Sequence, residues 1–307
     1  MLPVIVDTLP ALVYPTQAVV ETMNPTIMKN GSAVATEYQA AGDAGFGALW
    51  VVFVIMLASS GVFTVMSWNV PTSRRLYHFV TTLIVITAAL SYFAMASGQA
   101  VTEHCVTNYD KKAHEEVKVC RQVFYARYID WTLTTPLLLL DLCLLAGIDG
   151  AHTLMAIIAD IVMILTGLFA AFGDDDTGTQ KWGWYAIACF AYLVVIWHVT
   201  IHGQKMVRAK GQNTIKLFGS LAVFTFVLWT AYPIVWGIAD GARKASVDQE
   251  IFAYAILDVL AKPVFGMWLL LSHRNIPETN VDIDGYWSSG PQAEGRIRIG
   301  EDGRDGN

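Results

Sequence analysis

Six charged residues lie in segments of the sequence that are otherwise apolar. They are Arg127, Asp130, Asp141, Asp160, Asp258 and Lys262. A charge near the centre of a lipid bilayer costs at least about 2.5 kcal/mol, so each of these residues is by default a candidate for function. One such residue alone could be a paired structural group. Six together favour a functional site, whose chemistry would be that of a buried cation and its carboxylate counterions.

The spacing of these residues places one cation beside two carboxyl groups. Lys262 follows Asp258 by four residues, so the two side chains share a helix face. Asp130 lies eight residues after Gln122 and Asp258 eight after Glu250, which puts each carboxyl ~12 Å along its helix, at the same depth. A buried lysine alone would lose its proton to desolvation, but two carboxylates at that depth can keep it charged.

A further acid is expected deeper along the same helix. Asp141 follows Asp130 by eleven residues, which returns it almost to the same face, roughly 16 Å further on. Leucines occupy positions 137–140 and 142. A carboxyl group in that surrounding is expected to stay protonated at rest. Arg127 precedes Asp130 by about one helical turn, and so lies on the other side of Asp130 from Asp141.

An aromatic face follows in a later apolar segment. Trp229, Tyr232, Pro233 and Trp236 are spaced as i, i+3, i+4 and i+7, with a helix kink expected at the proline. As a bare pattern, such a face more often packs against another helix than against a ligand. Beside a buried amine, it favours a flat, conjugated ligand.

Seven apolar runs must position these residues. A helix that spans a bilayer needs ~20 mostly apolar residues, and runs of this kind lie at about 46–68, 77–100, 122–145, 151–172, 182–202, 217–239 and 251–272. Hydrophobic residues make up 54% of the 307 residues and charged residues 15%, with a mean hydropathy of +0.45, whereas soluble domains carry about 25% charge. We predict an all-α fold, a bundle of seven transmembrane helices joined mostly by short connections.

The chain ends and its charges indicate the topology. Residues 1–45 are predicted to form an extracellular tail rather than a cleaved signal, 46–272 the membrane domain and 273–307 a polar cytoplasmic tail. Glu37 and Asp43 precede the first span, whereas Arg74 and Arg75 follow it, which places the N-terminus outside. Asn30 begins a glycosylation sequon on that side. The net charge of −6, without a basic stripe, excludes a nucleic-acid-binding surface.

The four cysteines carry little information about function. Cys143 and Cys189 fall inside spans, where they are expected to be small buried apolar residues. Cys105 and Cys120 bracket the longest external loop and could form a disulfide or stay as two free thiols. We predict no metal site from the sequence.

Three motifs together resemble the microbial (type 1) rhodopsins. They are RYIDWTLTTP at 127–136 followed by Asp141, WTAYPIVW at 229–236 and LDVLAK at 257–262. The resemblance covers roughly residues 46–272 and is closest to bacteriorhodopsin and the fungal proton-pumping rhodopsins. It implies that Lys262 binds all-trans-retinal as a protonated Schiff base. Asp130 would then be the primary counterion and proton acceptor, Asp258 the second counterion, Asp141 the cytoplasmic proton donor and Thr81 its hydrogen-bonding neighbour.

The resemblance also implies the surroundings of this site. Thr134 belongs to the proton-transfer region, Tyr92 and Tyr232 would bond the counterions, and the external release group would comprise Arg127, Glu250 and Asp240. The retinal pocket would be formed by Trp131, Thr135, Leu138, Met163, Gly167, Tyr185, Trp229, Tyr232, Pro233 and Trp236, with Asp160 near the ring end.

Three positions depart from the pattern of the family. Tyr185 stands where the pocket often has tryptophan, which puts the colour in doubt, and Asp240 replaces a usual glutamate, whose longer reach aids proton release. Pro263 directly follows the lysine and removes a backbone N–H.

The implied activity is light-driven outward proton transport, with retinal, protons and the bilayer as partners, in the plasma membrane and as a possible homo-oligomer. The main alternative is a sensory photoreceptor with the same chromophore and a partner protein, which would not need a carboxyl at Asp141. A chloride pump should have a neutral residue in place of Asp130, and a sodium pump an Asn-Asp-Gln-type pattern. A receptor without retinal would leave the charges around Lys262 unexplained, and the width of any channel pore is not given by the sequence.

Overall fold

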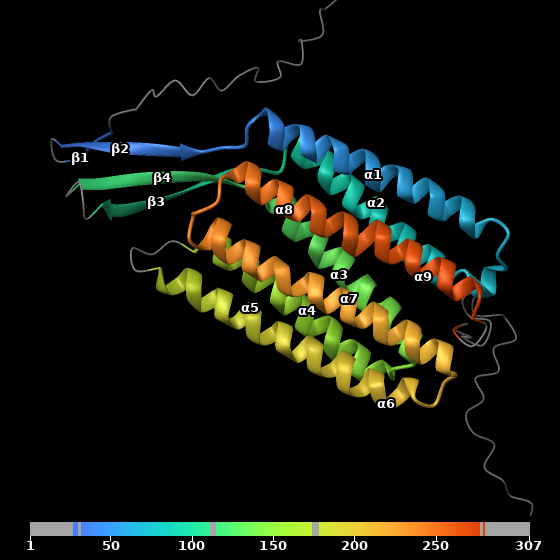
Figure 1. Ribbon diagram of the computed structural model, residues 1–307. Helices are drawn as coiled ribbons and strands as arrows, with labels where there is room; N and C mark the ends of the chain where they lie inside the picture. The colour runs from blue at the N-terminus through green and yellow to red at the C-terminus, as the bar shows by residue number, and fades with distance from the viewer. Residues whose placement is uncertain (1–26, 30–31, 111–114, 174–177, 277–278, 280–307) are drawn as a thin grey trace, which may run out of the picture.

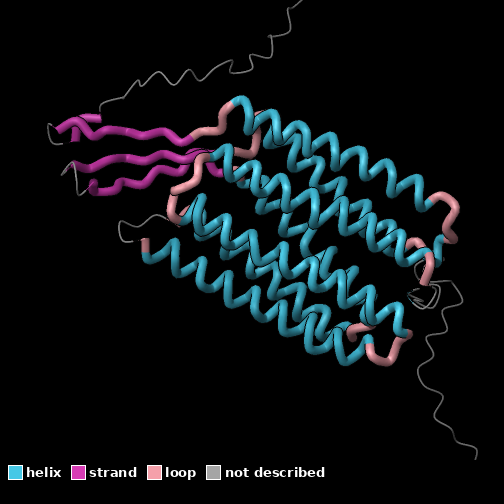
Figure 2. The backbone as a smooth tube through the Cα atoms, in the orientation of Figure 1, coloured by secondary structure: helices cyan, strands magenta, loops and turns pink. Residues whose placement is uncertain are grey.

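The computed structural model is a bundle of seven membrane-spanning helical segments with a small β-sheet at one end (Figures 1 and 2). It describes residues 27–29, 32–110, 115–173, 178–276 and 279. Each of the seven segments is long and apolar enough to cross a membrane. The prediction of a seven-helix integral membrane protein is therefore confirmed.

The helical elements follow the predicted runs, with ends that differ by a few residues. They are α1 (Asp43–Ser67), η1 (Thr72–Arg74), α2 (Leu76–Ala96), α3 (Tyr125–Ala146), α4 (Gly150–Ala171), α5 (Thr179–Trp197), η2 (His198–His202), α6 (Gly203–Val207), α7 (Gln212–Trp236), η3 (Gly237–Gly241), α8 (Val247–Val259), η4 (Leu260–Val264) and α9 (Phe265–Arg274). The fifth span runs from α5 to α6, the sixth from α7 to η3 and the seventh from α8 to α9. Among the spans, α3 is the most enclosed by its neighbours.

Three of the spans contain a π-helical segment, namely η2, η3 and η4. The segment η4 includes Lys262 and Pro263. A proline has no backbone N–H to donate, so a regular α-helical pattern cannot continue through it unchanged. The helix instead widens into a π-helical turn at Lys262 and Pro263. Turns of this kind are frequent at functional sites.

Local signals in the sequence explain where several helices begin and end. Gly147 ends α3 with a φ of 76°, a left-handed conformation that glycine adopts without steric cost. Asp149 then caps α4 by accepting a hydrogen bond from the backbone N–H of His152. Ser246 and Gln249 form a reciprocal capping box at the start of α8. These signals set the end of α3 and the starts of α4 and α8.

The sheet was not predicted. It contains β1 (Ile27–Lys29), β2 (Ser32–Gln39), β3 (Thr102–Asp110) and β4 (Glu115–Val123) in the order β1-β2-β4-β3. β2 pairs with β4 in parallel, and β3 pairs with β4 as an antiparallel hairpin. The sheet extends the bundle beyond the start of α1 and α3 (Figure 1). We call this the sheet end of the bundle and the opposite end the far end.

The outer surface of the bundle suits a lipid environment. Large apolar side chains such as Val51, Leu90 and Phe190 are exposed on its outside, while charged groups of the predicted site are buried inside. This arrangement is expected where the surrounding solvent is hydrocarbon. A disulfide joins Cys105 to Cys120 across the β3–β4 hairpin, so the first of the two alternatives for these cysteines is confirmed.

The predicted division into tail, membrane domain and tail stays a prediction. The segment before α1 includes β1 and β2, and thus contributes to the sheet. The sequon at Asn30 lies outside the described residues, as does almost all of the predicted C-terminal tail.

Candidate functional site

The centre of the site is the amine of Lys262, which lies between two carboxylates. Its Nζ is 2.5 Å from Oδ2 of Asp130 and 3.3 Å from Oδ1 of Asp258, and all three side chains are about 1% exposed. The predicted juxtaposition of α3 and the seventh span at this depth is therefore present. Two carboxylates face one buried ammonium, so removing the ammonium would leave two buried negative charges without a cation beside them.

The two carboxylates differ in their hydrogen bonds. Asp258 accepts hydrogen bonds from the hydroxyls of Tyr92 and Tyr232, each at 2.7 Å, and from Nε1 of Trp131 at 3.4 Å. Asp130 is bonded to Lys262 through Oδ2, while its Oδ1 has no hydrogen-bond partner among the described residues. Both predicted tyrosines thus bond Asp258, and neither bonds Asp130. The two carboxylates therefore differ in their donors: Asp258 has two hydroxyls and an indole N–H, whereas Asp130 has the closer contact with the Lys262 amine.

Two threonines of the α3 motif bond within their own helix. The hydroxyl of Thr134 donates to the backbone carbonyl of Asp130 at 2.8 Å, and that of Thr135 donates to the carbonyl of Trp131 at 2.7 Å. Thr135 also lies 2.6 Å from Oδ2 of Asp160 on α4. Asp160 therefore reaches the site through Thr135 rather than by contact with the Lys262 amine.

A largely apolar pocket opens from Lys262 and contains every predicted wall residue. These are Trp131, Thr135, Leu138, Met163, Gly167, Tyr185, Trp229, Tyr232, Pro233 and Trp236. Sequence reasoning missed further lining residues, chiefly Tyr128, Ile164, Ala188, Cys189, Tyr192 and Tyr254. They have the aromatic and small apolar types of ordinary helix packing, so no local signal distinguished them. The pocket does not include Tyr92 or Asp160 in its lining.

The pocket suits an elongated conjugated ligand attached to the lysine. Its walls are almost entirely apolar, with a few polar groups at the lysine end, which is the usual character of a cofactor site. A Cβ placed on Gly167 would approach only the Tyr128 ring, at 3.9 Å, so this glycine keeps one wall open. Aromatic rings surround the space, and the lysine amine supplies a nucleophile that can bind a carbonyl compound covalently. These features fit retinal.

Tyr185 occupies the position where tryptophan was expected, and it is held in place. Its ring stacks on Trp236 with a centroid separation of 5.0 Å and an interplanar angle of 15°. Its hydroxyl donates to the carbonyl of Pro233 at 3.0 Å, a carbonyl that also accepts from the backbone N–H of Gly237. The residue thus keeps an aromatic wall and adds a hydrogen bond at the proline.

Asp141 lies alone toward the far end. It is 0% exposed, and neither of its carboxyl oxygens has a hydrogen-bond partner among the described residues. The predicted hydrogen bond with Thr81 is not formed, because the Thr81 hydroxyl donates to the carbonyls of Tyr77 and His78 in its own helix. This prediction was wrong: a threonine inside a helix can satisfy its hydroxyl on the preceding turn. Burial without a partner favours the neutral acid.

A charged network lies at the sheet end. Glu250 accepts from Nη1 of Arg127 at 2.5 Å and from Nη2 of Arg121 at 2.7 Å, and Nε of Arg121 is 3.4 Å from Oδ1 of Asp240. The guanidinium of Arg127 also lies over the Tyr254 ring, 4.3 Å from its centroid. The predicted trio of Arg127, Glu250 and Asp240 is thus brought together, with Arg121 as the link to Asp240.

Arg121 was not predicted as a site residue. It comes from β4, is 1% exposed, and also donates to Oε1 of Gln39 on β2 at 2.8 Å. In the sequence it is one of several basic residues in a loop, and only the strand pairing turns it inward. No local signal could have identified it.

Comparison with known proteins agrees with this geometry. The family model described as "Bacteriorhodopsin-like protein" matches residues 47–276. Opsin-1 of Neurospora crassa is 58% identical over 304 residues, covering 95% of this chain and 100% of the relative. The crystal structure of a light-driven proton pump from Leptosphaeria maculans is 56% identical with a TM-score of 0.77, covering 79% of this chain and 99% of that one.

A more distant structure has the same architecture. The light-driven proton pump of Coccomyxa subellipsoidea is 40% identical with a TM-score of 0.70, covering 77% of this chain and 100% of that one. The family match spans all seven membrane segments, and these relatives align over most of their length. This chain therefore belongs to the bacteriorhodopsin-like family of microbial rhodopsins.

Proposed function

We propose that this protein is a light-driven outward proton pump that binds all-trans-retinal on Lys262. The observation that carries the proposal is the placement of three ionisable groups along one path. The Lys262 amine contacts Asp130 at 2.5 Å, and Asp141 lies buried toward the far end without a hydrogen-bond partner among the described residues. The relatives from Leptosphaeria maculans and Coccomyxa subellipsoidea are light-driven proton pumps, which supports the same activity here.

The chromophore supplies only the light-driven step. Retinal bound to Lys262 would absorb visible light and isomerise, and thereby change the direction in which the nitrogen proton points and its affinity for that proton. The rest of the cycle depends on side chains of this chain. Because Asp130 Oδ2 already accepts from the Lys262 nitrogen, it is the group within reach to take that proton as a general base.

The second half of the cycle would use Asp141. Desolvation favours its protonated form, so it holds a proton that it can donate to the Lys262 nitrogen as a general acid. Asp141 lies roughly 16 Å from Asp130 along α3, on the opposite side of the lysine from the sheet end. The Lys262 nitrogen would give its proton to Asp130 and receive a new one from Asp141. Both transfers move a proton in the same direction, toward the sheet end.

Release would occur at the sheet end. Arg127 lies about one helical turn from Asp130 on α3 and is bonded to Glu250, which with Arg121 and Asp240 forms the network described above. A carboxyl of this network can lose a proton when the charge of Asp130 changes. The Arg127 guanidinium then interacts less with Asp130 and more with Glu250, which favours ionised carboxylates in the network. If the N-terminus is outside, as the charges flanking α1 indicate, the sheet end faces the exterior and transport is outward.

The test is light-driven pH change in an unbuffered suspension of cells that express the full chain with all-trans-retinal. We expect external acidification on illumination, abolished by a protonophore. A coloured protein that causes no pH change would contradict the proposal and favour the sensory photoreceptor. External alkalinisation would contradict the direction alone. Purification from separated plasma membranes, with cross-linking of neighbouring chains, would test the proposed location and homo-oligomer.

A further inference from the structure

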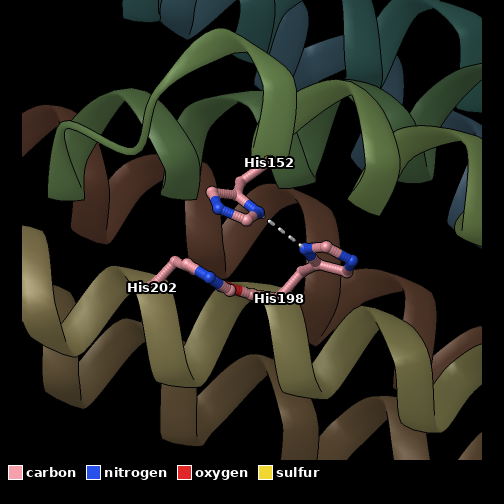
Figure 3. Close-up of side chains that lie close together, drawn as sticks. All are labelled: His152, His198 and His202. Atoms are coloured by element: carbon pink, nitrogen blue, oxygen red, sulfur yellow. Dashed lines mark hydrogen bonds between the residues drawn. The ribbon is translucent and has the colours of Figure 1, made fainter.

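Three histidines lie together at the far end of the bundle, outside the retinal pocket. His152 is on α4, and His198 and His202 are on the π-helical segment η2 that continues α5 (Figure 3). One ligand-type nitrogen from each ring can be chosen so that all three lie within 4.8 Å of one another. His198 is buried, whereas His152 and His202 are partly exposed. The cluster can therefore be reached from the end of the bundle.

The local structure holds two of the rings as a pair. His198 and His202 are four residues apart, so they project from the same side of the helix. Nδ1 of His202 lies 3.3 Å from the backbone carbonyl of His198. The ring of Trp197 meets both imidazoles edge-on, with centroids 4.8 Å from His198 and 5.3 Å from His202. This tryptophan shields the pair on one side.

The third ring comes from the neighbouring helix. Asp149 caps α4 by accepting from the backbone N–H of His152 at 3.0 Å. Its Oδ2 lies 4.0 Å from Nε2 of His152, while Nδ1 of the same ring faces His198.

The separation of the nitrogens suits a metal centre. Nδ1 of His152 and Nδ1 of His198 are 3.2 Å apart. Two nitrogens bound at about 2.0–2.1 Å to a tetrahedral ion are separated by roughly 3.3 Å. His202 must approach by rotating its partly exposed ring, which stacks on His152 with centroids 3.4 Å apart. Three imidazoles with a fourth position open to water are a ligand set typical of zinc.

We propose that His152, His198 and His202 bind one divalent transition-metal ion of the zinc class, which joins the start of α4 to the end of the fifth span. Neutral imidazole is the preferred ligand of such ions. The site is separate from Lys262 and its counterions, so it does not depend on the pump proposal. The competing interpretation is that His152 and His198 share a hydrogen bond between their Nδ1 atoms (Figure 3) and that the three rings only pack against one another.

The test is Zn²⁺ binding by the full-length protein in the dark. The protein is purified with an affinity tag that contains no histidine, and titrated with Zn²⁺ in competition with a chromophoric chelator. We expect one Zn²⁺ per chain. His202→Gln and His152→Gln should each weaken binding by more than the roughly 10–100-fold that is typical of changes beside the ligands. Both residues are partly exposed, so these substitutions should leave the bundle folded.

Two controls make the outcome decisive. His104→Gln removes a histidine from β3 at the sheet end and should leave the affinity for Zn²⁺ unchanged. In a second measurement, Zn²⁺ should raise the Tm of the wild type, because a ligand that binds only the folded state stabilises it. It should not raise the Tm of the double variant that combines His152→Gln with His202→Gln. Absence of binding by the wild type, or binding that survives in the double variant, would overturn the proposal.

Discussion

At the scale of single residues, the two carboxylates beside Lys262 differ in their hydrogen bonds. Asp258 accepts from Tyr92, Tyr232 and Trp131. Asp130 retains an oxygen without a partner among the described residues. Under the proposed function, Asp130 would take up the proton of the Lys262 nitrogen, because its Oδ2 already accepts from that nitrogen.

The first prediction concerns the attachment of the chromophore. Lys262→Ala should abolish the visible absorption band completely, because the pocket then offers no amine to bind retinal covalently. The measurement is the absorption spectrum after addition of all-trans-retinal to membranes. Lys205→Ala, at an exposed lysine, serves as the matched control and should keep the band. A coloured Lys262→Ala protein would exclude this lysine as the attachment site.

The second prediction concerns the proton acceptor. Asp130→Asn removes one of the two charges beside the Lys262 nitrogen, so the absorption maximum should shift to the red and transport should be lost. Spectra and light-driven pH changes are measured on the same preparation. Asp130→Glu retains the charge and should absorb closer to the wild type. Transport that persists in Asp130→Asn would remove its role as acceptor.

The third prediction concerns the donor. Asp141→Asn keeps the shape of the side chain but carries no transferable proton, so the last step of the photocycle should slow by roughly 100-fold or more, the usual contribution of a positioned acid. Azide, a small weak acid, should restore the rate. Flash photolysis of the wild type, Asp141→Asn and the exposed control Asp149→Asn provides the comparison. An unchanged decay in Asp141→Asn would exclude it as the donor.

At the scale of elements, local patterns predict most of the site. The i, i+4 pair Asp258 and Lys262, and the matched depth of Asp130, depend on spacing within single helices, where the geometry repeats every few residues. The same reasoning misplaced the hydroxyl of Thr81, because a helix offers a threonine its own backbone as an acceptor. It also overlooked His198 and His202, whose i, i+4 spacing was visible in the sequence but whose third partner lies on another helix.

The sheet illustrates what spacing does not predict. The residue pairs of β2 and β4, such as Gln39 and Arg121, are separated by about eighty positions in the sequence. Such a pairing depends on where the helices place the two segments. Neither strand has a sequence pattern that would predict its partner. Arg121 enters the charged network only through this pairing. Sequence analysis therefore missed both the element and the residue that it positions.

The fourth prediction concerns Arg121 as the link between the sheet and the bundle. Arg121→Gln should slow proton release to the medium, because Asp240 loses its cationic neighbour. It should also lower the Tm, since hydrogen bonds to charged groups contribute about 1.5–3 kcal/mol each. A pH-sensitive dye in flash experiments reports release, and loss of colour on heating reports stability. Lys244→Gln, at an exposed position of the same end, should change neither. Equal release rates in both variants would contradict this role.

At the scale of the whole molecule, the path is polarised. The charged network with Arg121, Arg127, Asp240 and Glu250 lies at the sheet end, and Asp141 lies toward the far end in an apolar surrounding. The two ends of the bundle thus differ in charge and polarity. Under the proposed function, protons would move toward the sheet end. Whether this direction is outward depends on how the chain is inserted.

The last prediction tests this insertion. Glu37 and Asp43 precede α1, whereas Arg74 and Arg75 follow it, and basic residues are retained on the cytoplasmic side. The N-terminus and the sheet should therefore face the exterior. An epitope added before residue 1 should bind antibody on intact cells, and one added after residue 307 only after permeabilisation. The reverse labelling would make the same displacement of protons inward, so that illuminated cells would alkalinise the medium while every residue kept its role.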